Sequence, residues 1–357
     1  MKLLVLAQTP PPLHGQSVMV QTLLEGLPGR GVAVHHVNLR LSRDTADIGR
    51  WRAGKIFAVL AACARAVAAR FHQGCDTLYY IPAPGQRGAL YRDWTVMLLC
   101  RPFFRRLVFH WHAAGLGEWL ATKATAPERW LTRWLLGRAD LALVLSPSLR
   151  ADAEFLAAKK IAVVPNGIAD PGAPAPRTSS APCQVLFLGL CSEEKGIFAA
   201  AEAVLAANRA APATFALAAA GSFPNADTEM RFQKLCAGHP HSLRQLGLVQ
   251  GADKARLFQT SDIFCLPTHH APEGQPLVLL EAMAYDLPVV ATRWRAIPDT
   301  LPPEAILVAP GDPHALTAAL LQFRDHRPPA GIFRWHFLAN FTTERHLDQL
   351  AAALQAL

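Results

Sequence analysis

Short apolar runs alternate with longer amphipathic segments along most of the chain. Apolar runs between turn residues are typical of buried strands, and apolar residues repeated every three or four positions are typical of helices. The strands expected in the first half are Lys2–Leu6, Val32–Val37, Thr77–Ile81, Leu107–Trp111 and Leu141–Leu145. The helices expected between them are Val18–Leu27, Ile56–Phe71, Ala89–Cys100 and Glu128–Leu136. This alternation predicts parallel α/β construction.

A proline-rich stretch, Asp170–Pro182, interrupts the pattern and is typical of a linker between domains. The alternation then restarts. The strands expected in the second half are Gln184–Leu188, Thr214–Ala219, Leu243–Gln245, Ile263–Leu266, Val289–Ala291 and Ile306–Val308. The helices expected there are Ile197–Arg209, Glu229–Ala237, Ala252–Thr260, Pro276–Tyr285, Pro313–Arg324 and a last segment, Thr343–Leu357.

The two alternating halves predict two doubly wound, Rossmann-like domains that face each other across a cleft. The first comprises residues 1–170 together with a C-terminal helix at about 332–357, and the second comprises residues 171–331. The length of 357 residues agrees with two domains, because a domain of about 150 residues is common. In such sheets ligands bind beyond the carboxyl ends of the strands, so we expect the functional residues in those loops.

The composition excludes several classes of protein. Hydrophobic residues make up 51% of the chain and charged residues 17%, which excludes disorder as the governing state. No apolar run approaches the ~18 residues that a membrane-spanning helix needs. The seven cysteines are widely spread without a Cys-x-x-Cys pair, so we expect neither a disulfide framework nor a structural zinc site. A reducing cytoplasm is the expected location.

The positive charge is concentrated in the first half. Residues 1–170 hold 21 Lys and Arg against 11 Asp and Glu, a net charge of +10, whereas residues 171–357 carry −2. This asymmetry predicts either a polyanionic partner for the first half, such as an anionic membrane surface, or an ordinary solvated basic surface. Two basic-aromatic stretches, Arg50–Phe57 and Tyr91–Trp94 with Arg101–Arg106, suit peripheral contact with an anionic bilayer, and equally suit helices with a buried aromatic face. No motif indicates nucleic-acid binding.

The segment after the strand Ile263–Leu266 is the richest in candidate chemistry. A polar loop leads to Pro276, which suits the first position of a helix because its missing N–H costs nothing there. The backbone N–H groups of Gly274, Gln275 and Leu277 then lie at the positive end of the helix dipole. This arrangement suits the oxygens of an anionic or hydroxyl-rich ligand.

Two carboxylates, Glu273 and Glu281, flank the start of that helix. If both were helical, their eight-residue spacing would correspond to ~12 Å of rise, beyond the 5–9.5 Å of a glycosidase pair. Two carboxylates that bind different parts of one extended ligand are easier to build. The alternative is that Glu273 caps the helix dipole and that Glu281 is surface charge.

Lys195 lies in the loop Leu188–Gly196, between a predicted strand and a predicted helix. A lysine at a helix N-terminus is electrostatically unfavourable unless an anion lies nearby, which makes Lys195 a candidate diphosphate ligand. The alternative is an exposed lysine without a ligand.

Two histidines and one loop are the candidates in the first half. His110 and His112 are two residues apart in a strand and therefore share one face, and we expect His110 to be a packed core residue. The pair lacks a third ligand in sequence for a metal. The loop Thr9–Ser17 fits neither the dinucleotide fingerprint nor the phosphate loop, which disfavours dehydrogenases and kinases.

These motifs together resemble the donor site of glycosyltransferase family 4, whose members are retaining enzymes of the GT-B fold that use nucleotide-diphosphate sugars. The resemblance rests on Glu273-x7-Glu281 with Ala-Met-Ala, and on Pro288–Thr292 and Ile297–Asp299. Val163–Gly167, Phe187–Gly189, Lys195-Gly196 and Ala220-Gly221 follow in the family's order.

The resemblance implies a role for each candidate residue. Glu273 would contact hydroxyls of the donor sugar, and Glu281 would bind the ribose of the nucleotide. The catalytic residues implied are His112, Lys195 and Glu273. The donor-binding residues implied are Gly15, Gln16, Lys195, Glu273, Gly274, Gln275, Pro276, Leu277 and Glu281, with Val249 beside the base. The acceptor-binding residues implied are Gly15, Gln16 and His112.

Two places depart from the family pattern, and one of them is the loop at Arg295 and Ala296, where the family often carries glycines. The family usually carries an arginine five residues before the lysine, where this sequence has Leu190. Arg293 and Arg295 are the candidates to replace the missing charge.

The function expected from the residues and the resemblance is retaining transfer of a hexosyl or N-acetylhexosaminyl group. The donor would be a nucleotide-diphosphate sugar such as a UDP-sugar, the acceptor a glycan or a lipid-linked molecule, and no metal or cofactor is expected. Two alternatives stay open: a sugar-nucleotide epimerase of similar fold, and a degenerate GT-B subunit that binds nucleotide sugar without turnover.

Overall fold

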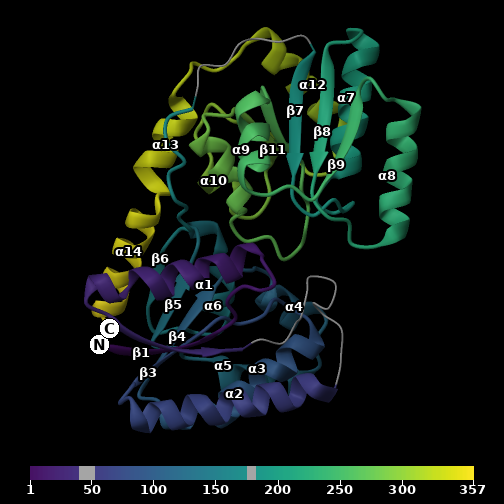
Figure 1. Ribbon diagram of the computed structural model, residues 1–357. Coiled ribbons are helices and arrows are strands. Elements are labelled where there is room, and N and C mark those ends of the chain that lie inside the picture. Colours follow the sequence, from purple (N-terminus) through teal and green to yellow (C-terminus); the bar gives the residue numbers. More distant parts are fainter. Residues whose placement is uncertain (40–52, 175–181) are drawn as a thin grey trace. The chain divides into compact units, whose positions relative to one another are not determined.

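The computed structural model describes residues 1–39, 53–174 and 182–357 of the chain (Figure 1). These residues form two compact units. Unit 1 comprises Met1–Gly167 and Thr343–Leu357, and unit 2 comprises Ile168–Thr342. Each unit has its own parallel sheet and its own hydrophobic core, which confirms the predicted α/β class with two doubly wound sheets.

The sheet of unit 1 has six strands in the order β2-β1-β3-β4-β5-β6, and all neighbouring strands are parallel. Its central strands are mostly apolar and are buried on both faces, as expected where helices cover both sides. The strands are β1 (Lys2–Ala7), β2 (Ala33–Asn38), β3 (Thr77–Tyr80), β4 (Arg106–Trp111), β5 (Leu141–Val144) and β6 (Ile161–Val163).

Helices cover both faces of this sheet. One face packs against α2, α3 and α5, and the other against α1 and α14 (Figure 1). The helices of unit 1 are α1 (Gly15–Gly26), α2 (Ala53–His72), α3 (Arg87–Cys100), α4 (Leu116–Thr122), α5 (Ala126–Leu136), α6 (Ala151–Phe155) and α14 (Thr343–Gln355). Three short 3₁₀ helices are η1 (Pro28–Arg30), η3 (Arg101–Phe103) and η4 (Pro147–Leu149).

The sheet of unit 2 also has six parallel strands, in the order β12-β11-β10-β7-β8-β9. The strands are β7 (Cys183–Leu188), β8 (Phe215–Ala220), β9 (Leu243–Gly247), β10 (Ile263–Leu266), β11 (Val289–Thr292) and β12 (Ile306–Val308). The helices are α7 (Ile197–Ala210), α8 (Ala226–Gly238), α9 (Gly251–Thr260), α10 (Leu277–Ala284), α11 (Ile297–Thr300), α12 (Pro313–Asp325) and α13 (Ile332–Asn340).

One part of the predicted division of the chain is wrong. Sequence analysis assigned residues 332–342 to the first domain, but they belong to unit 2. The physical reason is that Phe333 and Phe337 of α13 are buried in the core of unit 2, and Arg334 donates a 2.7 Å hydrogen bond to the carbonyl of Ala284. The chain enters unit 1 again only with α14, whose Leu350 and Leu354 pack against its sheet.

The structure can be compared with two expectations from composition. Every cysteine is a free thiol in the described chain, and no Cys pair is joined. No helix within residues 1–39, 53–174 and 182–357 combines the length and the hydropathy needed to cross a membrane. Most of the predicted linker and the residues Arg50–Trp51–Arg52 lie outside the described residues.

Candidate functional site

The strand order of unit 2 determines where its site lies. The first strand, β7, pairs with the fourth, β10, so the chain runs outward from this pair in both directions. At such a switch point two neighbouring loops diverge beyond the carboxyl ends of the strands and leave room for a ligand. The two loops are residues 189–196 and 267–276. They carry Lys195 and Glu273, which are 78 residues apart in sequence.

Close approach of these two loops depends on Gly196. This residue caps α7 with φ +88°, in the left-handed region that favours glycine. A Cβ atom there would lie 2.4 Å from the carbonyl oxygen of Pro267, at the start of the other loop. The preceding residue is held by a 3.1 Å hydrogen bond from the Lys195 N–H to the Ser192 hydroxyl. The Lys195 side chain therefore leaves a loop whose backbone is fixed.

Lys195 and Glu273 form an ion pair. The ammonium Nζ lies 2.8 Å from Oε1 and 2.7 Å from Oε2 of the carboxylate. The hydroxyl of Thr268 donates a further 3.0 Å hydrogen bond to Oε2. The Glu273 side chain is 7% exposed and that of Lys195 is 19% exposed. The ammonium group thus stays accessible to a ligand, while its carboxylate partner is held at the base of the loop.

The helix after this loop begins one residue later than predicted. Pro276 is the N-cap of α10, with φ −66° and ψ 118°, and Leu277 is the first helical residue. The ring fixes only φ, which suits a helix or an extended chain, and the extended ψ of Pro276 makes it the cap instead of the first helical residue. Gln275 is buried and its side chain donates a 3.2 Å hydrogen bond to Thr300. A ligand at this helix end would meet backbone N–H groups of the first turn, which have no intrahelical acceptor.

Glu281 lies on α10 and forms a lysine–glutamate ion pair of its own. Its Oε1 lies 2.5 Å from Nζ of Lys254, on α9. Its Oε2 is buried and has no hydrogen-bond partner within the described part of the chain. Burial raises the pKa of this carboxyl above its ordinary value, and the charge of Lys254 opposes that shift. A buried acceptor of this kind is a candidate for ligand hydroxyl groups.

Sequence analysis did not single out Lys254, although a signal was present. Lys254 lies in the first turn of α9, where a cation is as unfavourable as at Lys195. The loop before α9 contains Val249, which packs partly buried against the core of unit 2. The loop and the Lys254–Glu281 pair are thus joined by one turn of helix.

The structure gives the candidate arginines different surroundings. Arg295 has φ +49°, and its guanidinium donates a 3.1 Å hydrogen bond to the carbonyl of Ala271, in the Glu273 loop. It also lies over the ring of Trp294, at 5.1 Å from the centroid. Arg293 is exposed, as is Leu190, at 39%. Arg295 therefore braces the loop that carries Glu273.

The candidate histidines of unit 1 belong to a buried cluster. The rings of His110 and His112 have centroids 4.2 Å apart, and His346 of α14 stacks on His110 at 6.4 Å. The Tyr79 hydroxyl lies 2.5 Å from Nδ1 of His110, and the carbonyl of Pro165 lies 2.6 Å from Nδ1 of His346. His110 is 1% exposed, in agreement with a packed core residue, whereas His112 is only partly buried.

Burial keeps this cluster uncharged. It lowers the pKa of His112 to about 3, and the neighbouring charges of His346 and His14 lower it further in the same direction. Burial also lowers the pKa of His346 to about 4 and that of His110 well below its ordinary range. Near neutral pH, His112 is a neutral imidazole, which offers one donor and one acceptor to a ligand.

The loop before α1 approaches this cluster through His14. Helix α1 begins at Gly15, three residues earlier than predicted, because His14 is its N-cap and shares a capping box with Ser17. The ring of His14 accepts from the Ser17 N–H at 3.3 Å, and the Ser17 hydroxyl accepts from the His14 N–H at 3.1 Å. Gly15 and Gln16 are thus first-turn residues of α1. A charge on His14 lowers the pKa of His112.

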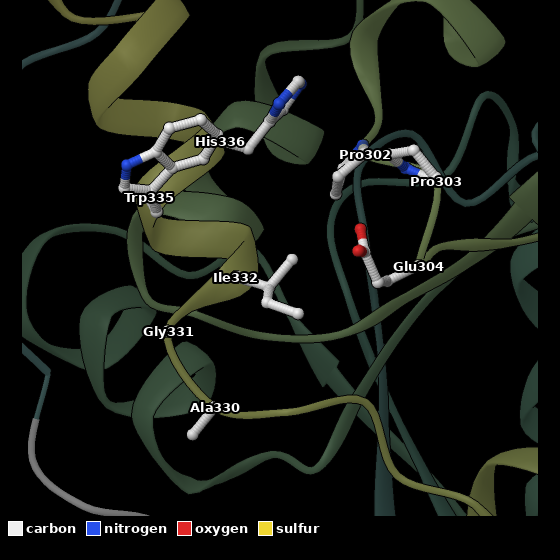
Figure 2. Close-up of a pocket in the computed structure, with 8 residues that line it drawn as sticks. All are labelled: Pro302, Pro303, Glu304, Ala330, Gly331, Ile332, Trp335 and His336. Carbon is white, nitrogen blue, oxygen red and sulfur yellow. The ribbon is translucent and has the colours of Figure 1, made fainter.

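A hollow in unit 2 lies among other residues. Figure 2 shows Trp335 and His336 of α13 on one side of it and Pro302, Pro303 and Glu304 on the other. None of the residues predicted for the site lines it. In the described ranges, no group of three or more His, Cys, Asp or Glu side chains is arranged to hold a metal ion. The expectation that no metal is needed stays a prediction.

Comparison with solved structures identifies the fold. The chain is similar to sucrose-phosphate synthase from Thermosynechococcus elongatus, with a TM-score of 0.77, 18% identity and coverage of 100% of this chain and 99% of that one. It is also similar to Anabaena HepE in complex with UDP (TM-score 0.71, 18% identity, 100% of both chains). A third is the lipopolysaccharide outer core galactosyltransferase WaaB (TM-score 0.72, 15% identity, 100% and 99%). The fold of this chain is the two-domain GT-B fold.

Comparison of sequences adds the family of unit 2. Residues 182–326 match the family described as Glycosyl transferases group 1, so the chain carries a domain of that family. A stretch of 85 residues is 36% identical to sulfoquinovosyl transferase SQD2 from Arabidopsis thaliana, and covers 22% of this chain and 16% of that protein. The resemblance to glycosyltransferases is thereby confirmed, and membership of family 4 in particular stays a prediction.

Proposed function

We propose that the protein is a retaining glycosyltransferase of family 4 that moves a hexosyl or N-acetylhexosaminyl group from a nucleotide-diphosphate sugar. The observation that carries the proposal is the Lys195–Glu273 pair at the switch point of unit 2. A cation and a carboxylate at one edge of a Rossmann-like sheet suit the two halves of such a donor, which has an anionic diphosphate and a hydroxyl-rich sugar.

Each half of the pair has a role in the proposed reaction. The ammonium of Lys195, shared with Glu273 in the free protein, would turn to the diphosphate oxygens and neutralise charge on the leaving nucleoside diphosphate. Glu273 would then accept hydroxyl groups of the sugar, while Thr268 keeps the carboxylate in place. The first-turn N–H groups of α10 would add to the stabilisation of the leaving group.

Helix α10 and the loop before α9 would supply the remaining contacts to the donor. Glu281 would accept the hydroxyl groups of the ribose through its buried Oε2, and the backbone near Val249 would contact the base. UDP is the first base to test, because HepE, a protein of similar fold, has been solved in complex with UDP and with UDP-glucose. No side chain is an obvious covalent nucleophile, so we propose a front-face mechanism with retention at the anomeric carbon.

Unit 1 is the proposed acceptor-binding unit. His112 would bind an acceptor hydroxyl as a neutral imidazole, with Gly15 and Gln16 beside it at the start of α1. The net charge of +10 over residues 1–170 favours an anionic, lipid-linked acceptor or a glycan at an anionic membrane, and a role in cell-envelope or polysaccharide synthesis.

The test is a calorimetric screen of UDP-, GDP- and ADP-sugars, with chromatography of the nucleotide products. We expect one donor to bind and to release its nucleoside diphosphate, slowly to water and faster with acceptor. Glu273→Gln and Lys195→Met should each abolish most of the release. The matched controls Glu202→Gln and Lys234→Met change exposed residues of unit 2 and should retain it.

The same screen separates the alternatives. A donor isomerised without any acceptor would assign the protein to the epimerases. Tight nucleotide binding without release, with release gained in Leu190→Arg, would assign it to non-catalytic GT-B subunits. If no nucleotide sugar binds at all, the proposal is wrong.

A further inference from the structure

One layer of helices in unit 1 exposes large apolar side chains. Phe57 and Phe71 of α2 are 72% and 67% exposed, and Trp130 and Trp134 of α5 are 67% and 60% exposed. Other large apolar residues exposed on the same layer are Ile56, Leu60, Tyr91, Leu98, Leu99 and Phe103. We refer to α2, α3, η3 and α5 together as the helical face of unit 1.

Helix α2 shows that this exposure is patterned. Its inward side packs Val59, Ala62, Cys63 and Ala66 into the core, as in any amphipathic helix. Its outward side should then be polar. Instead it presents an apolar stripe at helical spacing, formed by Phe57, Leu60, Ala61, Ala64, Ala68 and Phe71. A helix that is apolar on both sides needs a second apolar environment beyond its own core.

The elements of the helical face lie side by side. The rings of Phe71 and Phe103 meet edge to face at 6.2 Å, which joins α2 to η3. The Trp94 indole donates a 3.0 Å hydrogen bond to Thr132, which joins α3 to α5. Figure 1 shows α2, α3 and α5 gathered on one side of the sheet of unit 1.

The charges of the helical face are almost all positive. Asp93 and Glu128 are the acidic residues of these four elements, and both are buried. Each is bound by an arginine, at 2.7 Å from Arg92 and 2.9 Å from Arg87. The exposed charges of the face and of the chain after η3 are those of Arg65, Arg87, Arg133, Arg105 and Arg106, and of these Arg87 is paired with Glu128. An apolar surface framed by arginines complements an apolar layer bounded by negative charge.

We propose that the helical face of unit 1 docks on an anionic lipid bilayer. Aromatic rings and arginines are the side chains that suit the headgroup region, where the rings enter the apolar boundary and the guanidinium groups meet lipid phosphates. Phe57 and Phe103 are exposed, whereas Phe104 packs partly buried against the core, so the alternative of a buried aromatic face holds for only part of the basic-aromatic stretches. The proposal is independent of sugar transfer, because donor binding is assigned to unit 2.

Vesicle sedimentation with the full chain tests the docking. We expect at least tenfold stronger partition into vesicles of 30% phosphatidylglycerol than into pure phosphatidylcholine, and weaker partition at high salt because added ions screen the charge. Phe57→Ser/Phe71→Ser and Arg105→Glu/Arg106→Glu should each reduce the partition about tenfold.

Matched controls come from unit 2. Trp335→Ser and Met230→Ser remove exposed apolar side chains, and Arg244→Glu/Arg256→Glu reverses exposed charges. These variants should bind vesicles as the unaltered protein does. All variants are compared by circular dichroism and by calorimetric UDP-sugar binding, which should not change. Unaltered partition of the unit 1 variants, or equal binding to both vesicle types, overturns the proposal.

A second measurement tests directly whether the helical face of unit 1 enters the bilayer. Brominated lipids quench tryptophan within the bilayer, so they should quench the protein's fluorescence, and Trp130→Phe/Trp134→Phe should lose most of this quenching. Quenching that persists in that variant contradicts the assigned face. Binding to single-stranded RNA with higher affinity than to vesicles would assign the face to nucleic acid, and a concentration-dependent dimer lost in Phe57→Ser/Phe71→Ser would assign it to self-association.

Discussion

The two units share one architecture and use their polar residues in opposite ways. Each has a six-stranded parallel sheet covered by helices. At the carboxyl ends of its strands, unit 1 carries imidazoles that burial keeps neutral, whereas unit 2 carries lysine–glutamate pairs. Unit 1 places its charge on the outside, as arginines around exposed aromatic rings.

This difference shows what the shared fold does not determine. A parallel sheet provides loops at one edge, and the residues in those loops decide which ligand chemistry the edge accepts. Paired charges suit an anionic, hydroxyl-rich donor, because the cation can turn to the ligand while the carboxylate accepts hydroxyl groups. Neutral imidazoles suit an acceptor hydroxyl, since they bind it without attracting a competing anion.

The largest expected effect comes from removing the Lys195 charge. Loss of one preorganised group that stabilises a developing charge costs about 10²–10³ in kcat, so Lys195→Met should lower kcat by that factor. Steady-state kinetics with saturating UDP-sugar measure the loss. His112→Gln in unit 1 should raise the KM for acceptor instead and leave donor hydrolysis unchanged. Equal loss of donor hydrolysis in both variants would contradict the division of roles.

The next largest effect is a loss in the free energy of unfolding, which should differ between two glycines with positive φ. In unit 2, Gly196→Ala places a Cβ against a backbone carbonyl at 2.4 Å, in addition to the left-handed conformation that costs ~1–2 kcal/mol. In unit 1, Gly31→Ala has φ +75° but its nearest neighbour is 3.7 Å away. Chemical denaturation should show a loss of about 3 kcal/mol for Gly196→Ala and about 1 kcal/mol for Gly31→Ala. Equal losses would mean that the approach of the two loops is not tight.

Acid should destabilise unit 1 more than unit 2. The folded pKa values of His112 and His346, about 3 and about 4, lie below the ordinary value near 6.5. The unfolded chain therefore binds more protons below pH 6.5, and the free energy of unfolding should fall by about 2 kcal/mol for each of the two imidazoles between pH 6.5 and 4.5. Glu281 acts in the opposite direction, because its folded pKa is raised and its contribution grows as the pH falls.

Hydrogen exchange, corrected for the intrinsic effect of pH and mapped by mass spectrometry, measures this difference unit by unit. His346→Gln should flatten the pH dependence of unit 1, since the amide does not take up a proton. His314→Gln, at an exposed position of unit 2, is the control. A parallel loss of protection in both units would contradict the role of the buried imidazoles.

The sequence predicted the sheets well and the short elements poorly. Apolar runs such as Ile263–Leu266 and Ile306–Val308 match the observed strands exactly in their bounds, because both lie between clear turn signals. The edge strand β6 was missed since it has three residues of intermediate burial after two lysines. Helix α13 was assigned to the wrong unit because periodicity indicates a helix but not the core against which its Phe333 and Phe337 pack.

The site was predictable where one loop carries it, and less so where two elements meet. The Gly274–Leu277 segment and Glu281 follow from local motifs. The ion pair between Lys195 and Glu273 depends on strand order, which brings residues 78 positions apart into contact. Lys254 was missed because no motif marks it, although its first-turn position was a usable physical signal.

Lys254→Met should lower nucleotide affinity moderately, by an amount that depends on pH. Without the lysine, nothing opposes the raised pKa of Glu281, so the carboxyl should stay protonated to higher pH and accept ribose hydroxyl groups less well. We expect nucleotide affinity to fall about tenfold at pH 7, which is about 1.4 kcal/mol, and to recover as the pH rises. Calorimetry between pH 6 and 9 measures it. A uniform loss at all pH values would indicate that Lys254 contacts the nucleotide itself.

The smallest expected effect is a gain in kcat/KM. Leu190 lies in the loop between β7 and α7, on the same edge as Lys195, and is exposed enough to be replaced without a cavity or a clash. An arginine there would add one charge-assisted contact to the diphosphate, and solvent screening at the exposed position limits it to about 1 kcal/mol, or fivefold in kcat/KM. The gain should appear in unit 2 alone, so Leu190→Arg should leave vesicle binding and acid stability of unit 1 unchanged. Leu190→Lys is the matched control, because its ammonium forms no bidentate contact and should give a smaller gain. No gain from either variant would indicate that Lys195 and the α10 N–H groups already complete the shell around the diphosphate.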